Sequence, residues 1–489
     1  MAAPAASYVP DRRPRAPAPD SRPLSTPRPF TAARVLFLLD VLALALAWLP
    51  LLRYGCGGGA CVASALDGVT ATLFPAANIA ALYALGLYRR DALIETRGAL
   101  RRIPLAVGLG AIGALALSSV LAIWLGFSPH LLSFAALAAF GFGSAGIGAR
   151  LIFALLRERS LFGRRVLIVG AGARAWDLVW LLRKEGRTPH YDVHFVHEDA
   201  FGPVDPRLAA EHGQNIVPLR EHDVLQVARR LQCDQIVIAP DERRGMKLEP
   251  LLSCKASGFP VTEYLTFLEH EIRRIDVKRI EVGWLLSSAG FTFGVLDRAL
   301  KRFLDLAVSA MFLVLSTPLL VGAALAIKLG DRGPVFYSQE RVTRGGRPFR
   351  IYKLRTMRTD AEKLGAVWAA RRDPRITRVG RFLRATRIDE LPQLWNVVRG
   401  DMSLVGPRPE RPEFVCDLAA KLPLYHERHR VKAGLTGWAQ VNYPYGASLD
   451  DARSKLSYDL YYVKNFGVLF DLLIILQTLR VVLTPSTAR

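Results

Sequence analysis

Two adjacent carboxylates, Asp389 and Glu390, are the residues of this chain best placed to do chemistry. Arginines precede them at Arg384 and Arg387, and Pro392 follows them. Neighbouring residues of a helix or turn point in different directions, so the two carboxylates can take different roles. One can attack phosphorus as a nucleophile while the other holds a magnesium ion. We therefore treat the pair as the candidate catalytic residues and as candidate Mg²⁺ ligands.

The segment around the pair has a helix signal. Proline is tolerated in a first helical turn, and glycine often follows a helix end, which predicts a short helix from about Pro392 to just before Gly400. The pair then lies at the positive end of that helix, where an anion is favoured. The alternative is a capping box, Thr386-x-x-Asp389, with no catalytic role. That reading puts Pro392 in the second helical turn, at a cost of about 3 kcal/mol.

Phosphoryl transfer also needs cations that hold the non-bridging oxygens. Basic residues near the carboxylates and in other Gly- or Pro-containing segments are candidates for binding a phosphorylated substrate. They are Lys353, Arg355, Arg384, Arg387 and Arg408. For each of them the alternative is a surface charge or one that faces a membrane.

Charge and hydropathy narrow the class of protein. The 489-residue chain has a net charge of +22 and a mean hydropathy of +0.20. Nucleic-acid binding would explain the charge but not the apolar content, so we expect no nucleic-acid partner. A membrane protein on an anionic cytoplasmic leaflet, handling phosphorylated substrates, explains both properties.

The first third of the chain predicts a four-helix transmembrane bundle. Residues 1–33 form a basic, Pro- and Ala-rich segment that we expect to be disordered. Four apolar runs follow, each near the roughly 20 residues that cross a bilayer: 34–52, 68–88, 103–126 and 131–155. Arginine-rich loops alternate with loops of almost no positive charge, which predicts a cytoplasmic N-terminus. The spacing leaves open whether Cys56 and Cys61 pair, and we expect the other three cysteines to be core residues.

Residues 163–275 predict a Rossmann-like α/β domain. An apolar strand, Val166–Val169, is followed by a Gly-x-Gly-x-x-Ala sequence and an apolar helix. The acidic residues at 198–199 fall late for the ribose-binding acid of a dinucleotide site. A nucleotide site and a scaffold without a ligand both remain open.

A fifth apolar run follows a linker at 276–300 and contains Pro318 near its middle. We predict a re-entrant helix at 303–329 that breaks at Pro318 and returns to the same side, with Ser316 or Thr317 satisfying the carbonyl that proline leaves free. A plain spanning helix is the alternative. Residues 466–483 predict an amphipathic helix at the membrane interface.

Several motifs after Lys301 resemble the bacterial sugar transferase family, the polyprenyl-phosphate hexose-1-phosphate transferases. They occur in order as Lys-Arg-x-x-Asp, Gly-Pro-Val-Phe-Tyr, Lys-Leu-Arg-Thr-Met, Asp-Glu-Leu-Pro-Gln-Leu, Gly-Pro-Arg-Pro and Leu-Thr-Gly-x-x-Gln-Val. The four spans and the Rossmann-like domain are similar to those of the long-form members, which initiate exopolysaccharide and O-antigen synthesis.

The resemblance implies that a hexose-1-phosphate moves from a UDP-sugar to polyprenyl (undecaprenyl) phosphate, with release of UMP. Asp389 would be the nucleophile that forms an aspartyl-phosphosugar intermediate, and Glu390 would position Mg²⁺ on the diphosphate. Residues 301–485 would form an α-rich, monotopic catalytic domain, cytoplasmic like the Rossmann-like domain, on a multi-pass protein of the bacterial inner membrane. We also expect a homodimer.

The sequence suggests two other candidate functions. A membrane-anchored nucleotide-sugar dehydratase or epimerase also joins spans to a Rossmann domain, but its chemistry normally needs Tyr-x-x-x-Lys. No tyrosine of this chain has a lysine four residues later. A non-enzymatic, nucleotide-sensing membrane scaffold is the third possibility. The hexose and the length of the lipid chain do not follow from the sequence.

Overall fold

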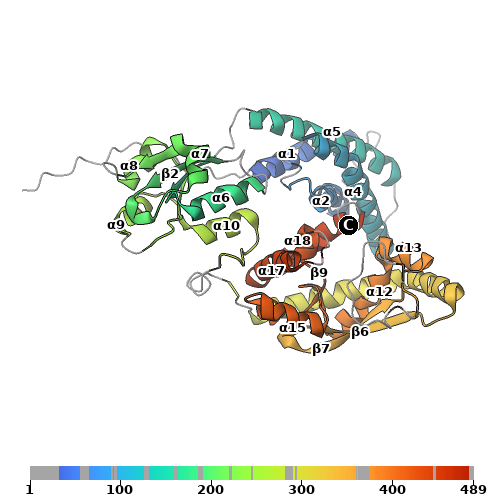
Figure 1. The fold of residues 1–489 in the computed structure, drawn as a ribbon. Helices are drawn as coiled ribbons and strands as arrows, with labels where there is room; N and C mark the ends of the chain where they lie inside the picture. The colour runs from blue at the N-terminus through green and yellow to red at the C-terminus, as the bar shows by residue number, and fades with distance from the viewer. Residues whose placement is uncertain are drawn as a thin grey trace, which may run out of the picture.

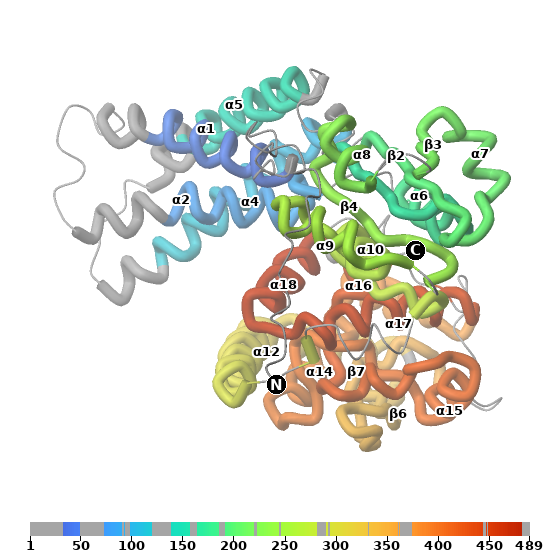
Figure 2. Tube along the Cα trace, turned by 90° about the vertical axis from the view of Figure 1, so that its left-hand side faces the viewer, coloured from blue at the N-terminus to red at the C-terminus, as the bar shows by residue number. Residues whose placement is uncertain are grey.

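The computed structural model describes the chain in segments: residues 32–54, 65–89, 92, 96–125, 131–158, 164–184, 191–219, 223–243, 246–280, 290–291, 294–359, 361, 374–443, 446 and 448–483. These residues form a group of long N-terminal helices, a parallel sheet covered by helices, and a mixed C-terminal region (Figures 1 and 2). The expected tail and the Cys56 and Cys61 loop lie outside the described residues.

All four predicted apolar runs contain a long helix. The helices are α1 (Ala32–Tyr54), α2 (Ala65–Ala84), α4 (Thr96–Leu125) and α5 (Leu131–Glu158). Helix α1 packs on α5, α2 packs on α4, and α4 packs on α5. Within the described part of the chain, three helices are long and apolar enough to cross a membrane, in segments Gly98–Ser119, Ala138–Leu156 and Val295–Gly330. The chain is therefore a membrane protein.

A buried polar cluster joins three of the N-terminal segments. Arg150 of α5 donates a hydrogen bond to Asp40 of α1, and its guanidinium lies over the ring of Tyr88, which follows α2. Asp40 lies eight residues after the start of α1, and Arg150 lies eight residues before the end of α5. The start of α1 and the end of α5 are therefore at the same end of the group of helices.

The middle of the chain forms a five-stranded sheet in the order β3-β2-β1-β4-β5. Its strands are β1 (Arg164–Val169), β2 (Tyr191–His197), β3 (Ile216–Pro218), β4 (Gln235–Ile238) and β5 (Val261–Glu263). All neighbouring strands are parallel, and this order is that of a doubly wound sheet. The helices between the strands are α6 (Ala173–Lys184), α7 (Pro206–His212), α8 (Val224–Arg230), α9 (Glu249–Ala256) and α10 (Tyr264–Ile272).

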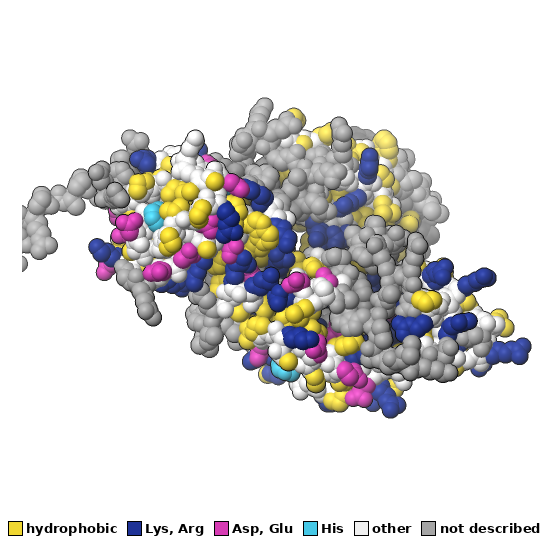
Figure 3. Space-filling model, viewed as in Figure 1, with side chains coloured by type: hydrophobic (Ala, Val, Ile, Leu, Met, Phe, Trp, Pro, Cys, Tyr) yellow, Lys and Arg dark blue, Asp and Glu magenta, His cyan; other side chains and the backbone are white. Residues whose placement is uncertain are grey.

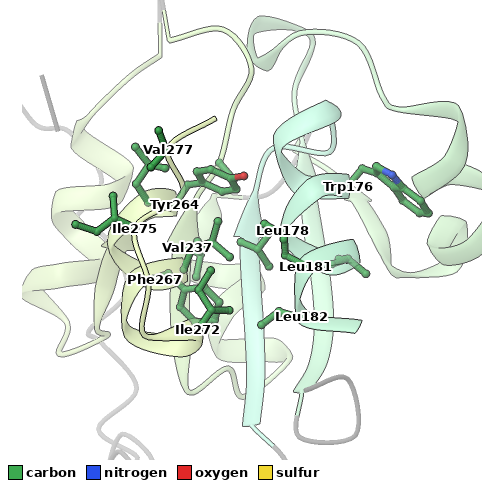
Figure 4. Close-up of a cluster of buried hydrophobic side chains, with 14 of the residues drawn as sticks. Trp176, Leu178, Leu181, Leu182, Val237, Tyr264, Phe267, Ile272, Ile275 and Val277 are labelled. Atoms are coloured by element: carbon green, nitrogen blue, oxygen red, sulfur yellow. The ribbon is translucent and has the colours of Figure 1, made fainter. Parts of the chain in front are cut away.

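Successive side chains of β1 pack on opposite faces of this sheet. Val166 and Ile168 pack with α6 and α10, whereas Leu167 and Val169 pack with α8 and α9. Figure 4 shows the first of these clusters, with leucines of α6 facing Phe267 of α10. Burial on both faces explains why the two central strands contain continuous apolar runs, Val166–Val169 in β1 and Ile236–Ile238 in β4.

The first cluster extends beyond the sheet into the C-terminal region. Val277, which is 3% exposed, lies in it together with Val415 and Leu456. Val277, at the start of the expected linker at 276–300, is therefore a core residue. Helix α12 begins at Val295, before the expected end of that linker.

The fifth apolar run is one helix, α12 (Val295–Asp331), with Pro318 inside it. The predicted break is not seen, because the helix continues through the proline. Ser316 and Thr317 both donate to the carbonyl of Leu313, at 3.3 and 2.8 Å. Proline at 318 deprives the carbonyl at 314 of its usual donor, so the hydroxyls bond one residue before the predicted position.

The C-terminal region surrounds two small sheets. Strands β6 (Phe336–Val342) and β7 (Pro348–Leu354) are antiparallel, and β8 (Ser403–Val405) and β9 (Gly434–Thr436) are parallel. The helices are α13 (Arg378–Thr386), α14 (Gln393–Arg399), α15 (Pro412–Lys421), α16 (Trp438–Asn442), α17 (Leu449–Lys464) and α18 (Val468–Leu483). Helix α18 matches the predicted amphipathic helix and packs on α2. Cys233 and Cys254 are buried as expected, but Cys416 is exposed because it lies on the outer side of α15.

Candidate active site

The two carboxylates lie in a tight turn between two helices. Helix α13 ends at Arg387, which has a left-handed conformation with a φ of 60°, and the 3₁₀ turn η5 (Ile388–Glu390) follows directly. Helix α14 then starts after Pro392 and ends at Gly400, whose φ is 97°. The predicted helix is confirmed within one residue.

The capping-box alternative is wrong. The hydroxyl of Thr386 donates to the carbonyls of Phe382 and Leu383, at 2.9 and 3.2 Å. Thr386 therefore belongs to the last turn of α13 and does not cap a following helix. The Asp389 carboxylate is therefore not part of a capping box.

Glu390 is held by three cations. Its Oε1 lies 2.9 Å from Nη2 of Arg408 and 3.8 Å from Nζ of Lys353, and its Oε2 lies 3.8 Å from Nη1 of Arg387. Burial opposes the charged form of Glu390, but Arg408, Lys353 and Arg387 outweigh it and lower its pKa to about 2. Glu390 is therefore a fixed negative charge at neutral pH.

Asp389 has the opposite environment. It is 8% exposed, and among the described residues no hydrogen bond to its carboxylate is present. Burial and then the charge of Glu390 raise its pKa to about 6, against the attraction of Lys353, Arg384 and Arg387. A buried carboxylate without hydrogen-bond donors is poorly stabilised and is therefore a stronger nucleophile than one in water.

Lys353 enters the site from β7. Burial lowers its pKa to about 8, although the neighbouring Glu390 favours its charged form. Asn396 of α14 fixes β7, the strand that carries Lys353. The Asn396 side chain accepts a hydrogen bond from Tyr352 N at 3.0 Å and donates one to Arg350 O at 2.8 Å. Helix α14 and strand β7 are thereby joined directly beside the carboxylates.

Of the other two predicted substrate-binding cations, Arg384 lies near the carboxylates and Arg355 does not. Arg384 donates from Nε to Thr356 Oγ1 at 2.9 Å and is close enough to act on Asp389. Arg355 is 7% exposed, and its guanidinium lies against Gly333, where an added Cβ would overlap it. Arg355 is therefore not one of the cations around Glu390, and its predicted substrate-binding role is not supported by its position.

The start of α12 is connected to the same site. Arg302 donates from Nη1 and Nη2 to the carbonyls of Val397 and Val398, at 2.7 and 2.8 Å, and so satisfies the C-terminal end of α14. Asp305 accepts from Ser403 Oγ and Leu404 N at 3.0 and 3.1 Å. The sequence analysis did not predict either contact, although the Lys-Arg-x-x-Asp motif contains both residues.

The site has the donors that magnesium needs. In the described part of the chain no group of three or more metal-binding side chains occurs. Mg²⁺ usually takes only one or two protein carboxylates, with substrate phosphates and water completing its shell. Asp389 and Glu390 supply those carboxylates, so the residues present fit a magnesium–diphosphate complex.

The Gly-x-Gly loop of the sheet domain is already filled. The Asp241 carboxylate accepts from the backbone amides of Ala173 and Arg174, at 2.7 and 2.8 Å, at the N-terminus of α6. A Cβ added at Gly172 would overlap this carboxylate. A phosphate would use the same amides, so Asp241 takes the position of the anion.

Comparison with known proteins gives consistent results. The family model for "Bacterial sugar transferase" matches residues 296–485. The chain is 41% identical, over 69% of its length and 78% of the relative's, to a UDP-N-acetylgalactosamine-undecaprenyl-phosphate N-acetylgalactosaminephosphotransferase of Aeromonas hydrophila. It is 45% identical, over 38% of its length and 71% of the relative's, to a UDP-glucose:undecaprenyl-phosphate glucose-1-phosphate transferase of Caulobacter vibrioides.

Proposed function

The chain belongs to the bacterial sugar transferase family, and we propose that it transfers a hexose-1-phosphate from a UDP-sugar to undecaprenyl phosphate. The observation that carries this proposal is the pairing of the buried Asp389, whose carboxylate accepts no hydrogen bond from the residues that the structure describes, with the charged Glu390. The relatives' names supply the substrate class. The dehydratase or epimerase alternative gains no support from these comparisons.

Asp389 acts as the nucleophile in this proposal. Its carboxylate oxygen attacks the phosphorus that carries the sugar, a new P–O bond forms, and the bond to the bridging oxygen breaks. UMP leaves with that oxygen and its electron pair. An oxygen of undecaprenyl phosphate then attacks the same phosphorus, which releases Asp389 and gives undecaprenyl-diphospho-sugar.

The surrounding cations stabilise charge on the phosphates. Lys353, Arg387 and Arg408 already compensate Glu390, and they are placed to bind diphosphate oxygens beside it. Mg²⁺ held by Glu390, with Asp389 nearby, would neutralise charge on the leaving UMP. Arg384 keeps a positive charge close to Asp389, which favours its ionised form before attack.

We also propose that α12, although it continues through Pro318, lies within one leaflet with both of its ends on the cytoplasmic side. Asp305 contacts β8, whereas Ala323 and Ile327 pack with Leu354 of β7 and Leu383 of α13. These contacts are about 27 Å apart along a helix, close to the roughly 30 Å hydrocarbon thickness. A straight crossing would pull the charged domain into the bilayer, so an inclined helix with both ends on the cytoplasmic side fits better.

The remaining assignments follow from that topology. The four N-terminal helices cross the membrane as a bundle, and the Rossmann-like domain at 163–275 and the catalytic domain at 301–485 lie in the cytoplasm. The position of Asp241 supports a scaffold role for the sheet domain. Basic side chains gather over α13 and the adjoining end of α12 in Figure 3, as expected near anionic lipid, and we retain the homodimer as part of the proposal.

The activity is tested with purified protein in nanodiscs. We expect UMP release when the protein, Mg²⁺ and undecaprenyl phosphate meet one member of a panel of UDP-sugars, and no release after Asp389→Asn. Absence of UMP with every sugar would contradict the proposal. For the topology, a cysteine placed just after Lys328 should be labelled only from the cytoplasmic side, and periplasmic labelling would exclude the re-entrant helix.

A further inference from the structure

The loop that carries Arg408 is bonded at four successive carbonyls. The oxygens of Pro407, Arg408, Pro409 and Glu410 accept hydrogen bonds from Gly434 N, Arg428 Nη2, Arg341 Nη1 and Val342 N. Two of the donors are backbone amides of strands, Gly434 in β9 and Val342 in β6. The other two are guanidinium groups, so side chains fix the middle of the loop.

All three guanidinium nitrogens of Arg428 donate hydrogen bonds. Its Nη2 donates to Arg408 O at 3.0 Å and to Asp459 Oδ2 at 2.8 Å. Its Nε donates to the same Asp459 oxygen at 3.1 Å, and its Nη1 donates to Tyr425 OH at 2.9 Å. The side chain is 5% exposed, so Arg428 itself cannot reach a substrate.

Arg408 is the residue that faces the site. Its side chain is 35% exposed and donates to Glu390, whereas its carbonyl is held from behind by Arg428. We propose that Arg428, paired with Asp459, is a positioning residue that aims Arg408 at Glu390 and at the incoming diphosphate. This inference rests on the proposed function and assigns Arg428 no contact with the substrate.

Helix α17 makes a rigid support for this arrangement. It carries Asp459 and is bound to the sheet domain at two points: Lys464 Nζ lies 2.6 Å from Glu269 Oε2, and Ile275 N donates to Ser457 O at 3.0 Å. Asp459, the counter-ion of Arg428, is therefore on a helix that is fixed to the sheet domain. A planar guanidinium can serve three acceptors at once, and an ammonium cannot hold the same geometry.

A double-mutant cycle with Arg428→Lys and Arg408→Gln tests the proposal. Arg428→Lys alone should lower kcat/KM for the UDP-sugar roughly tenfold, because a charge-assisted hydrogen bond that places Arg408 is lost. In the Arg408→Gln background the same change should have almost no effect, since no guanidinium remains to be aimed. Effects that multiply in the double variant would overturn the proposal.

The burst of UMP, measured before lipid is added, counts the competent sites in each preparation, so misfolded protein does not enter the comparison. Arg430→Lys is the matched control, because Arg430 lies in the same turn and forms an exposed pair with Glu427; it should behave as wild type. Where Arg428→Lys does not fold, Tyr425→Phe removes one acceptor of Arg428 and should show the same dependence on Arg408. A wild type that releases no UMP defeats the proposed function, whereas an active wild type with multiplying effects defeats only the positioning role.

Discussion

Replacing Asp389 by asparagine should make the fold more stable while it abolishes transfer. Burial and the charge of Glu390 raise the pKa of Asp389 from 3.8 to about 6. At 1.36 kcal/mol per pH unit, this rise corresponds to about 3 kcal/mol by which folding disfavours the charged carboxylate. Asparagine has nearly the same shape and no charge, so most of this cost disappears.

The pH dependence has a definite sign. An acid whose pKa is raised by folding binds its proton more tightly in the folded state, so its contribution to stability falls as pH rises from about 4 to about 6 and then stays level. Asp389→Asn lacks this fall. The variant should therefore resemble wild type at pH 4 and exceed its free energy of unfolding by roughly 1–3 kcal/mol at pH 7.5.

Thermal unfolding in nanodiscs, followed by tryptophan fluorescence at several pH values, measures the difference. Asp417→Asn is the control, because Asp417 is an exposed carboxylate paired with Lys421, and it should change stability little at any pH. A variant at Asp389 that is less stable than wild type at pH 7.5, or differs from it equally at all pH values, would refute the reasoning.

Three further predictions concern the same structure. The kcat/KM for the UDP-sugar should rise through pH 6 as Asp389 ionises and fall above pH 8 as Lys353 loses its proton; a flat profile between pH 5 and 9 would contradict the assignment. Lys464→Met should lower the free energy of unfolding by about 3–5 kcal/mol, because it leaves Glu269 buried without a counter-ion. Chemical denaturation should show that the free energy of unfolding recovers when Glu269 is also replaced by leucine. Calorimetry should detect no binding of dinucleotides to the sheet domain, since Asp241 occupies the amides; micromolar binding would show that this carboxylate is displaced.

The local features of the site were accessible from the sequence. Pro392 and Gly400 bracket α14 because proline suits a first turn and glycine suits a left-handed helix end, and both preferences act within a few residues. The four apolar runs and the parallel strands were found for the same reason. Apolar periodicity and run length report burial without knowledge of the partner.

The features that were missed depend on partners far along the chain. Arg302 lies in the Lys-Arg-x-x-Asp motif and Arg428 has ordinary sequence surroundings, but only the fold shows that Arg302 satisfies the end of α14 and that Arg428 holds the carbonyl of Arg408. Arg355 was expected at the substrate because it lies in a basic motif, but its buried guanidinium lies against Gly333, a contact that the sequence pattern does not indicate. The burial of Val277 was not predicted, because a single valine in a charged segment carries too weak a signal of burial.

The most direct test of the account is the covalent intermediate on Asp389. The protein is incubated with Mg²⁺ and a UDP-sugar labelled in the sugar, without lipid acceptor, and is then quenched with acid. Wild type should retain label in an amount stoichiometric with the enzyme and release the same amount of UMP, and Asp389→Asn should retain none. Label that never appears on wild type, or that stays on Asp389→Asn as strongly, would contradict the nucleophile assignment.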